Sequence, residues 1–256
     1  MSTVALALRQ ARYTNRAFWR NPASAFFTFA FPLMFLVIFT ALLGSGHVDL
    51  GGGRIVRQST YYVSAMASFA VITACFTNVA MTTAFQRDQG VLKRLNGTPL
   101  PAGAYFAARV LHALFVAILL VVITSAFGAA AYHASVPSGT TLGRFAVMLL
   151  VGAGSFCALA FALTSVIPNA DAAPAVVNAT ILPLLFLSGI FIPFGSNAPS
   201  WIVWVAKIFP VWHFARGLQA GFLGTAFDWT DVLIVAAWGM GGLILAVRGF
   251  SWEPRV

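Results

Sequence analysis

Apolar residues fall into runs that recur along the chain and are separated by polar or glycine- and proline-rich stretches. A transmembrane helix needs about 20 largely apolar residues to cross about 30 Å of hydrocarbon. Six runs are candidates by this measure: residues 22–43, 60–85, 103–131, 142–167, 174–192 and 231–247. The pattern predicts an all-α membrane protein with six transmembrane helices, folded as one domain over residues 1–256.

Two regions outside these runs are also expected to be helical. Arg9, Arg12, Arg16 and Arg20 lie three or four residues apart and share one helical face, which predicts an amphipathic interfacial helix over residues 1–21. Such a helix serves as a lipid-surface anchor or as a docking element, and its basic character favours the anchor.

Residues 193–230 are apolar but interrupted by Pro193, Pro199 and Pro210. These prolines interrupt the region too often for it to form one transmembrane helix. We predict two short re-entrant extracellular helices there, near residues 200–209 and 211–223, because irregular backbone at membrane depth must be covered by protein or water.

Composition supports the membrane class. The chain has 60% hydrophobic and 8% charged residues, with a mean hydropathy of +0.88, whereas a soluble domain has about 25% charged residues. In a soluble protein the net charge of +9 would suggest nucleic acid as a partner. Here the basic residues lie beside the apolar runs, where anionic lipid headgroups are found. Membrane lipids are therefore the expected partner, and nucleic acid is not.

The placement of Lys and Arg also predicts the orientation. With the N-terminus inside, the inner segments contain Arg9, Arg12, Arg16, Arg20, Arg87, Lys93, Arg94, Arg109, Arg248 and Arg255. The outer segments contain Arg54, Arg57, Arg144, Lys207 and Arg216. This bias of ten to five predicts that both termini are cytoplasmic, in the cell's inner membrane.

Candidate catalytic chemistry is sparse. The six acidic residues form no close carboxylate pair, and His47, His112, His133 and His213 are scattered without the spacing of metal ligands. We expect a non-catalytic subunit with no metal or cofactor of its own.

One polar stretch, residues 86–100, has the character of a short cytoplasmic helix between spans two and three. Val91, Leu92 and Leu95 form a narrow apolar face flanked by Lys93 and Arg94. This pattern suits docking into a groove on a partner. A charged turn that obeys the positive-inside bias explains it equally well.

Two segments resemble a known family. Residues 87–100 contain Arg-Asp-Gln-Gly, Lys-Arg-Leu and Thr-Pro-Leu, while residues 187–193 read Leu-Ser-Gly-Ile-Phe-Ile-Pro and precede Pro199-Ser200-Trp201 and Phe209-Pro210. In this order they resemble the coupling helix and the extracellular signature of ABC type-2 exporter permeases, which include daunorubicin-resistance and polysaccharide-export subunits. The chain departs from the family at Asp88, where glutamate is common, and at residues 211–216, which are more aromatic.

The resemblance implies a permease subunit of an ATP-driven exporter, paired with a second permease copy or paralogue and with ATPase subunits that bind ATP and Mg. A P-loop needs a Gly-Lys pair, and the two lysines, Lys93 and Lys207, follow Leu92 and Ala206. ATP hydrolysis is thus expected on a partner chain. By the resemblance, Arg87, Asp88, Lys93 and Arg94 would make its polar contacts, and Val91, Leu92 and Leu95 its apolar ones.

Polar residues inside the spans usually hold helices together. Asn78 and Asn178 are the better candidates for a transport path, together with Ser188, because an unpaired amide in lipid is costly. A path lined by aromatic and aliphatic residues predicts a hydrophobic or amphiphilic substrate such as a drug, a lipid or a lipid-linked glycan. The alternative, an ion-coupled secondary transporter, would need midplane carboxylates, and none is evident.

Overall fold

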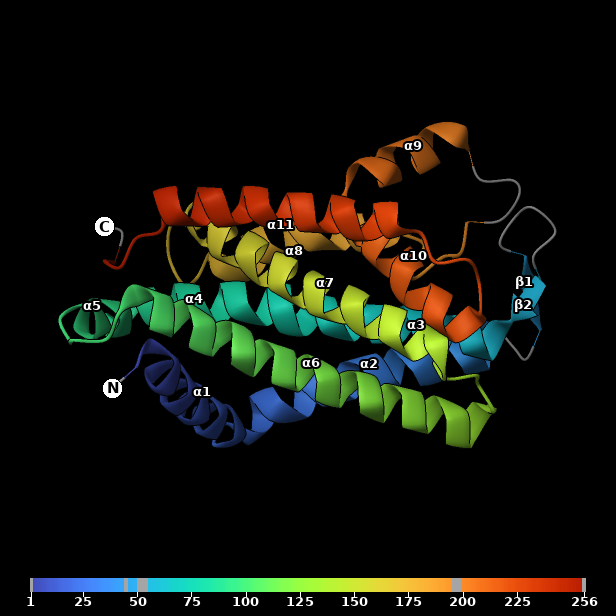
Figure 1. Cartoon of the computed structure of the whole chain (residues 1–256), viewed down its shortest axis with the longest axis horizontal. Helices are drawn as coiled ribbons and strands as arrows, with labels where there is room; N and C mark the ends of the chain where they lie inside the picture. The colour runs from blue at the N-terminus through green and yellow to red at the C-terminus, as the bar shows by residue number, and fades with distance from the viewer. Residues whose placement is uncertain (1, 44–45, 50–54, 195–198, 255–256) are drawn as a thin grey trace.

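The computed structural model describes residues 2–43, 46–49, 55–194 and 199–254, and these residues are mostly helical (Figure 1). Arg54 and Arg255, which were counted for the orientation, lie outside the described residues, as do residues 195–198 of the predicted re-entrant region.

Five helical stretches in the described part are long and apolar enough to cross a membrane. They are α2 (Pro22–Leu43), the continuous stretch Gln58–Asp88, α6 (Ala102–Tyr132), α7 (Thr140–Thr164) and α11 (Trp229–Gly249). These bounds lie within about three residues of the predicted spans. The prediction of an all-α membrane protein is therefore confirmed at the level of class.

The stretch Gln58–Asp88 forms the centre of the bundle. It consists of α3 (Gln58–Ile72), a π-helical turn η1 (Thr73–Thr77) and α4 (Asn78–Asp88). Nearly all of α3 is buried, whereas α2 is largely exposed on the periphery. Asn21 begins α2 as a cap, because its Oδ1 accepts a hydrogen bond of 3.2 Å from the Ser24 N–H.

The fifth predicted span differs from the expectation. The helix there, α8 (Ala173–Phe186), has only 14 residues, which gives a length of about 21 Å. The chain then turns at Gly189, whose φ of 77° is unfavourable for a side chain. The Tyr61 hydroxyl donates to the Gly189 carbonyl and holds this turn against α3. A full-length span over residues 174–192 is not confirmed.

Two short helices follow, α9 (Ser200–Ile208) and α10 (Pro210–Leu223), with a sharp bend at Phe209. α10 packs between α3, α7 and α11, while α9 projects from the bundle (Figure 1). Gly152 on α7 is required for this packing, because a Cβ there would lie 2.1 Å from the Phe214 ring.

The two ends of the bundle carry different elements. Both termini lie at the end that carries α5 (Val91–Asn96), which we call the α5 end (Figure 1). The hairpin of β1 (His47–Asp49) and β2 (Ile55–Arg57) lies at the opposite, hairpin end. The N-terminal helix α1 (Thr3–Trp19) lies along α6, with Ala7 buried against the bundle.

Candidate functional site

The α5 segment is held close to the bundle by a tight turn. α4 ends at Asp88, and Gly90 adopts φ 67°, a left-handed conformation that glycine accepts without strain. The Gly90 N–H donates to the Arg87 carbonyl at 3.0 Å, which closes the turn before α5 begins at Val91.

Arg87 points into the protein rather than toward a partner. Its side chain is 2% exposed and donates to the carbonyls of Thr164, Ile167 and Pro168 at 2.9, 2.7 and 3.1 Å. These carbonyls lie at and just beyond the end of α7, where acceptors lack helical partners and the helix dipole favours a cation. Arg87 therefore stabilises the C-terminus of α7.

Asp88 strengthens the same contact between the end of α4 and the end of α7. One carboxylate oxygen accepts a hydrogen bond of 2.6 Å from the Ala170 N–H, and the other lies 3.8 Å from Arg87 Nε. Arg87 and Asp88 together connect the end of α4 to the turn between α7 and α8. Both residues were predicted to contact an ATPase directly, and within this chain their side chains bond to the α7–α8 turn.

The apolar edge of α5 also faces inward. Leu92, which was predicted to be an apolar contact with the ATPase, is completely buried within the chain. Val91 and Leu95 are half-buried, whereas Lys93 and Arg94 are exposed. The Lys93 ammonium lies 3.4 Å from the Glu253 carboxylate near the C-terminus. The outward face of α5 is therefore mainly basic.

The three candidate path residues lie apart. Ser188 is buried in the turn after α8, where its hydroxyl donates to the Leu185 carbonyl at 2.7 Å. Asn178 is exposed on α8. Asn78, the first residue after the π-helical turn, lines a polar cavity. Because π-helical turns are frequent at functional sites, this cavity is the better candidate for a site.

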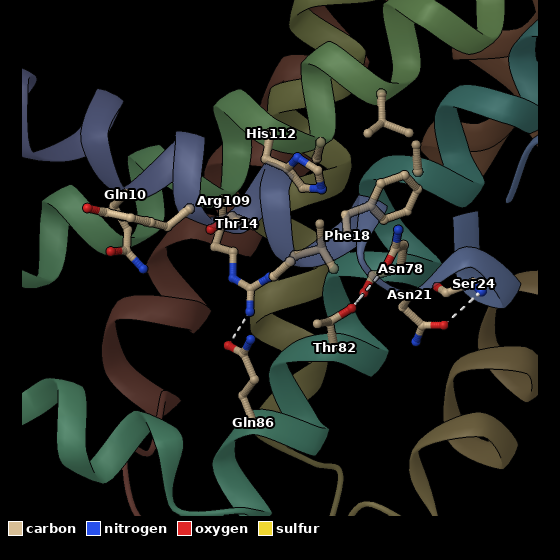
Figure 2. A pocket seen from close by; sticks show the side chains of 16 residues that line it. Gln10, Thr14, Phe18, Asn21, Ser24, Asn78, Thr82, Gln86, Arg109 and His112 are labelled. Carbon is tan, nitrogen blue, oxygen red and sulfur yellow. Dashed lines mark hydrogen bonds between the residues drawn. The ribbon is translucent and has the colours of Figure 1, made fainter. Parts of the chain in front are cut away.

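The cavity has a volume of about 350 Å³ and lies between α1, the start of α2, the η1–α4 segment and α6. Figure 2 shows its sixteen lining residues, and we call it the α1 cavity. Thr82 Oγ1 lies 2.6 Å from the Asn78 carbonyl and 2.8 Å from its Oδ1, so this amide is oriented by its own helix. The lining residues include no carboxylate.

A buried cation forms part of the wall. Arg109 on α6 is 7% exposed and donates from Nη2 to Gln86 Oε1, as Figure 2 shows. Its Nε donates to the Tyr105 hydroxyl at 3.3 Å. No ion pair of Arg109 is found within the described residues. The charge therefore has neutral hydrogen-bond partners and no counter-ion from the described chain.

His112 lies one helical turn beyond Arg109 on α6. It is 9% exposed, and its Nδ1 has no hydrogen-bond partner within the described residues. Its ring packs edge-on against Phe18 of α1, with centroids 5.4 Å apart. The sequence interpretation used Arg109 only for orientation and treated His112 as an ordinary histidine. Their spacing of three residues, which places both on one face of a span, was the available signal.

A second polar cluster lies toward the hairpin end. Asp231 on α11 is 1% exposed and accepts from His213 Nδ1 at 2.6 Å and from Arg216 Nε at 2.7 Å. His213 Nε2 lies 2.9 Å from the Lys207 carbonyl. Both partners of the imidazole are acceptors, so the ring satisfies both only when each nitrogen carries a proton.

Asp228 completes this hairpin-end cluster. It caps α11 by accepting from the Thr230 N–H at 2.9 Å, and it also pairs with Arg216 at 2.8 Å. The hydrogen bonds from Thr230 and the nearby guanidinium lower the pKa of the Asp228 carboxyl below its ordinary value. Every charge in the cluster thus has an opposite partner.

The described part of the chain is a helical multi-pass membrane protein. It has several apolar helices of membrane-spanning length, a short basic helix between two of them, and a polar cavity beside an amphipathic helix. The chain belongs to the ABC-2 type transporter family, whose model matches residues 6–223. The resemblance inferred from the sequence is confirmed.

The similar curated proteins have names of the same kind. "Putative transport permease ycf38" of Porphyra purpurea is 26% identical over 228 residues, which cover 86% of this chain and 75% of that protein. "Putative transport permease YvfS" of Bacillus subtilis (strain 168) is 22% identical over 232 residues and covers 89% of both chains. A ycf38 protein of Pyropia yezoensis is 24% identical over 228 residues. These names are consistent with a non-catalytic membrane subunit.

Proposed function

We propose that this chain is the transmembrane permease subunit of an ATP-driven exporter, and that α5 is its coupling helix. The observation that carries the proposal is the position of α5. It lies between two spans, at the end with both termini, and presents Lys93 and Arg94 outward while Arg87 and Asp88 anchor its base. A separate ATPase subunit would bind ATP and Mg and contact this basic face.

Movement of α5 would be transmitted through its anchor. Arg87 holds the C-terminus of α7 through three carbonyls, and Asp88 holds the backbone of Ala170 just before α8. When a partner displaces α5, α4 and the α7–α8 turn should therefore move as one body. Leu92 contributes by fixing α5 to the bundle rather than by entering a groove on the ATPase.

The topology in the membrane follows from the same arrangement. The α5 end would be cytoplasmic because it carries most of the Lys and Arg residues. The chain would cross the membrane six times, with α8 and the turn after it as the fifth crossing. α9 and α10 would be re-entrant: the Trp238 indole donates to the Ile208 carbonyl at 3.1 Å, near the middle of α11. The working unit would be a dimer of permease chains.

The expected substrate is hydrophobic or amphiphilic. Apolar grooves of about 730 Å³ between α6, α7 and α11, and of about 540 Å³ between α7, α8 and α11, open on the bundle surface. Their walls are mainly aromatic, aliphatic or small residues, with Arg248 at the second groove, and they suit acyl chains or drug-like molecules. We propose transport from the cytoplasm or the inner leaflet outward.

Co-purification tests the proposal. The full-length permease, tagged and expressed at its natural level, is extracted gently from its own cells, and the associated chains are identified by mass spectrometry. We expect a P-loop ATPase to be recovered with the wild type and lost with the double variant Lys93→Glu/Arg94→Glu. The matched control, Arg57→Glu/Arg144→Glu, changes two exposed arginines of the hairpin end and should retain the ATPase. Transport by the permease without any ATPase partner would contradict the proposal.

A further inference from the structure

The α1 cavity contains a charge that no acidic residue of the described ranges neutralises. Arg109 is buried in a membrane-spanning helix, and the hydrogen-bond partners of its side chain, Gln86 and Tyr105, are neutral. Asp88, the acidic residue at the end of α4, lies 3.8 Å from Arg87 Nε and accepts a hydrogen bond from the Ala170 N–H. A buried cation without a counter-ion is costly, because desolvation is not offset by a nearby negative charge. An anion from outside the chain would remove that cost.

The donor groups around the cavity suit an anion with several oxygens. A guanidinium presents five N–H donors in a planar fork that matches phosphate geometry. Nε and Nη2 of Arg109 are used by Tyr105 and Gln86, which fix the plane of the group. His112 lines the same cavity and is 9% exposed, and its Nδ1 has no hydrogen-bond partner within the described residues. Figure 2 shows the Arg109 side chain extending from α6 to Gln86 of α4, and the His112 ring lying beside Phe18 of α1.

The positive charge lies toward one end of the cavity. Arg109 and Gln86 lie toward the α5 end, while Ala74, Asn78 and Val116 line the part nearer the centre of the span. Gln86 and Ala74 are twelve residues apart in one continuous helical stretch, which corresponds to about 18 Å. A molecule with an anionic group near Arg109 and a less polar part toward Ala74 fits this arrangement.

We infer that the α1 cavity is a binding site for a phosphate-bearing group, held by the Arg109 guanidinium and by the His112 imidazole. The phosphate can come from the headgroup of an anionic lipid or from a soluble phosphate compound, since both offer the same oxygens. The inference goes beyond the proposed function and uses it only to place the cavity at the cytoplasmic face. Binding of the phosphate group requires neither ATP nor the ATPase. The binding inference can therefore be wrong while the proposed export function is right, and the export function can be wrong while the binding inference is right.

Lipid retention is the first test. The full-length permease is reconstituted in nanodiscs containing equal parts of phosphatidylcholine and phosphatidylglycerol, and the retained lipids are measured by native mass spectrometry. We expect preferential retention of phosphatidylglycerol by the wild type. In Arg109→Gln this preference should fall about tenfold or more, as expected for losing a charge-assisted hydrogen bond. The control Arg12→Gln removes an exposed arginine of α1 that does not line the cavity and should keep the preference.

A second variant guards against misfolding of the first. His112→Phe keeps the Arg109 charge, removes the second donor and fills part of the cavity, so it should also lose the preference. An equal loss in Arg12→Gln, or an unchanged preference in either cavity variant, would overturn the inference.

The source of the phosphate is distinguished in lipid-free detergent. Inorganic phosphate and glycerol 3-phosphate are added, and the midpoint of thermal unfolding is measured. A rise in the wild type that is absent in Arg109→Gln supports a soluble phosphate ligand. No rise, combined with phosphatidylglycerol retention in nanodiscs, supports a lipid headgroup. If neither probe distinguishes the wild type from Arg109→Gln, the α1 cavity is not an anion site.

Discussion

The hairpin-end cluster and the α1 cavity contain similar side chains and differ in one respect. Each places a histidine and an arginine of one helix against neighbouring helices. In the hairpin-end cluster both groups meet the buried carboxylate of Asp231. In the α1 cavity, Arg109 donates to the neutral groups of Gln86 and Tyr105, and His112 Nδ1 has no hydrogen-bond partner among the residues that the structure describes.

This difference separates a structural joint from a binding site. The buried carboxylate of Asp231 has its hydrogen bonds satisfied by His213 and Arg216 and fixes α10 to α11. A buried guanidinium beside a cavity keeps donors for a ligand. Arg87 provides a third case at the α5 end, since three backbone carbonyls of the α7 terminus surround it. The presence of a buried charge alone therefore does not identify a site; its partners do.

The largest effect is expected at Asp231. Asp231→Ala would leave His213 and Arg216 without their shared carboxylate, and breaking a buried ion pair costs about 3–5 kcal/mol. The free energy of unfolding in detergent micelles, measured by denaturant titration, should fall by that amount. The exposed neighbour Asp228→Ala is the control and should have a much smaller effect. Equal effects of the two variants would show that the cluster does not depend on the buried carboxylate.

The next effect is expected at Arg87. Arg87→Met removes the donors for three carbonyls at the end of α7 while keeping an elongated apolar side chain. The free energy of unfolding should fall by about 2–3 kcal/mol, the typical value for a hydrogen bond to a charged group. The same denaturant titration measures it, and an unchanged stability would contradict the anchoring role of Arg87.

The same substitution at Arg109 should act differently. In detergent without phosphate or anionic lipid, Arg109→Met replaces a buried cation that has no counter-ion, at the expense of hydrogen bonds to Gln86 and Tyr105. We expect the free energy of unfolding to be unchanged or raised by about 1 kcal/mol. Added phosphatidylglycerol should then stabilise the wild type more than the variant. A loss of stability as large as that of Arg87→Met would remove the distinction between the two arginines.

The smallest effect on stability is expected on the outward face of α5. Lys93 and Arg94 are exposed, and the pair between Lys93 and Glu253 is open to solvent. Lys93→Glu/Arg94→Glu should change the free energy of unfolding by no more than about 0.5 kcal/mol, as is usual for surface substitutions. A larger change would mean that this face is structural.

Much of the fold is predictable from the sequence because its signals are local. Asn21 and Pro22 set the start of α2, and the apolar runs define α6, α7 and α11 closely. The exception is α8. Apolar residues continue to Ile192, but Gly189 turns the chain and the distant Tyr61 stabilises that turn, so hydropathy overestimates the helix.

The candidate site was harder to predict because its contacts are distant in sequence. Arg87 and the carbonyl of Pro168 are 81 residues apart, and nothing local indicates that they meet. The apolar edge of α5 was correctly recognised, but periodicity does not tell whether Leu92 faces the bundle or a partner. Gln86 and Arg109 approach each other only through the packing of α4 and α6.

The central claim is that the basic face of α5 receives the ATPase. The most direct test is the affinity of the purified ATPase subunit for the permease in nanodiscs, measured by surface plasmon resonance. For Lys93→Glu/Arg94→Glu we predict a Kd about 100-fold higher than for the wild type, because like charges at an interface cost several kcal/mol. Arg57→Glu/Arg144→Glu, at the hairpin end, should leave the Kd unchanged. An unchanged Kd in the α5 variant would contradict the account.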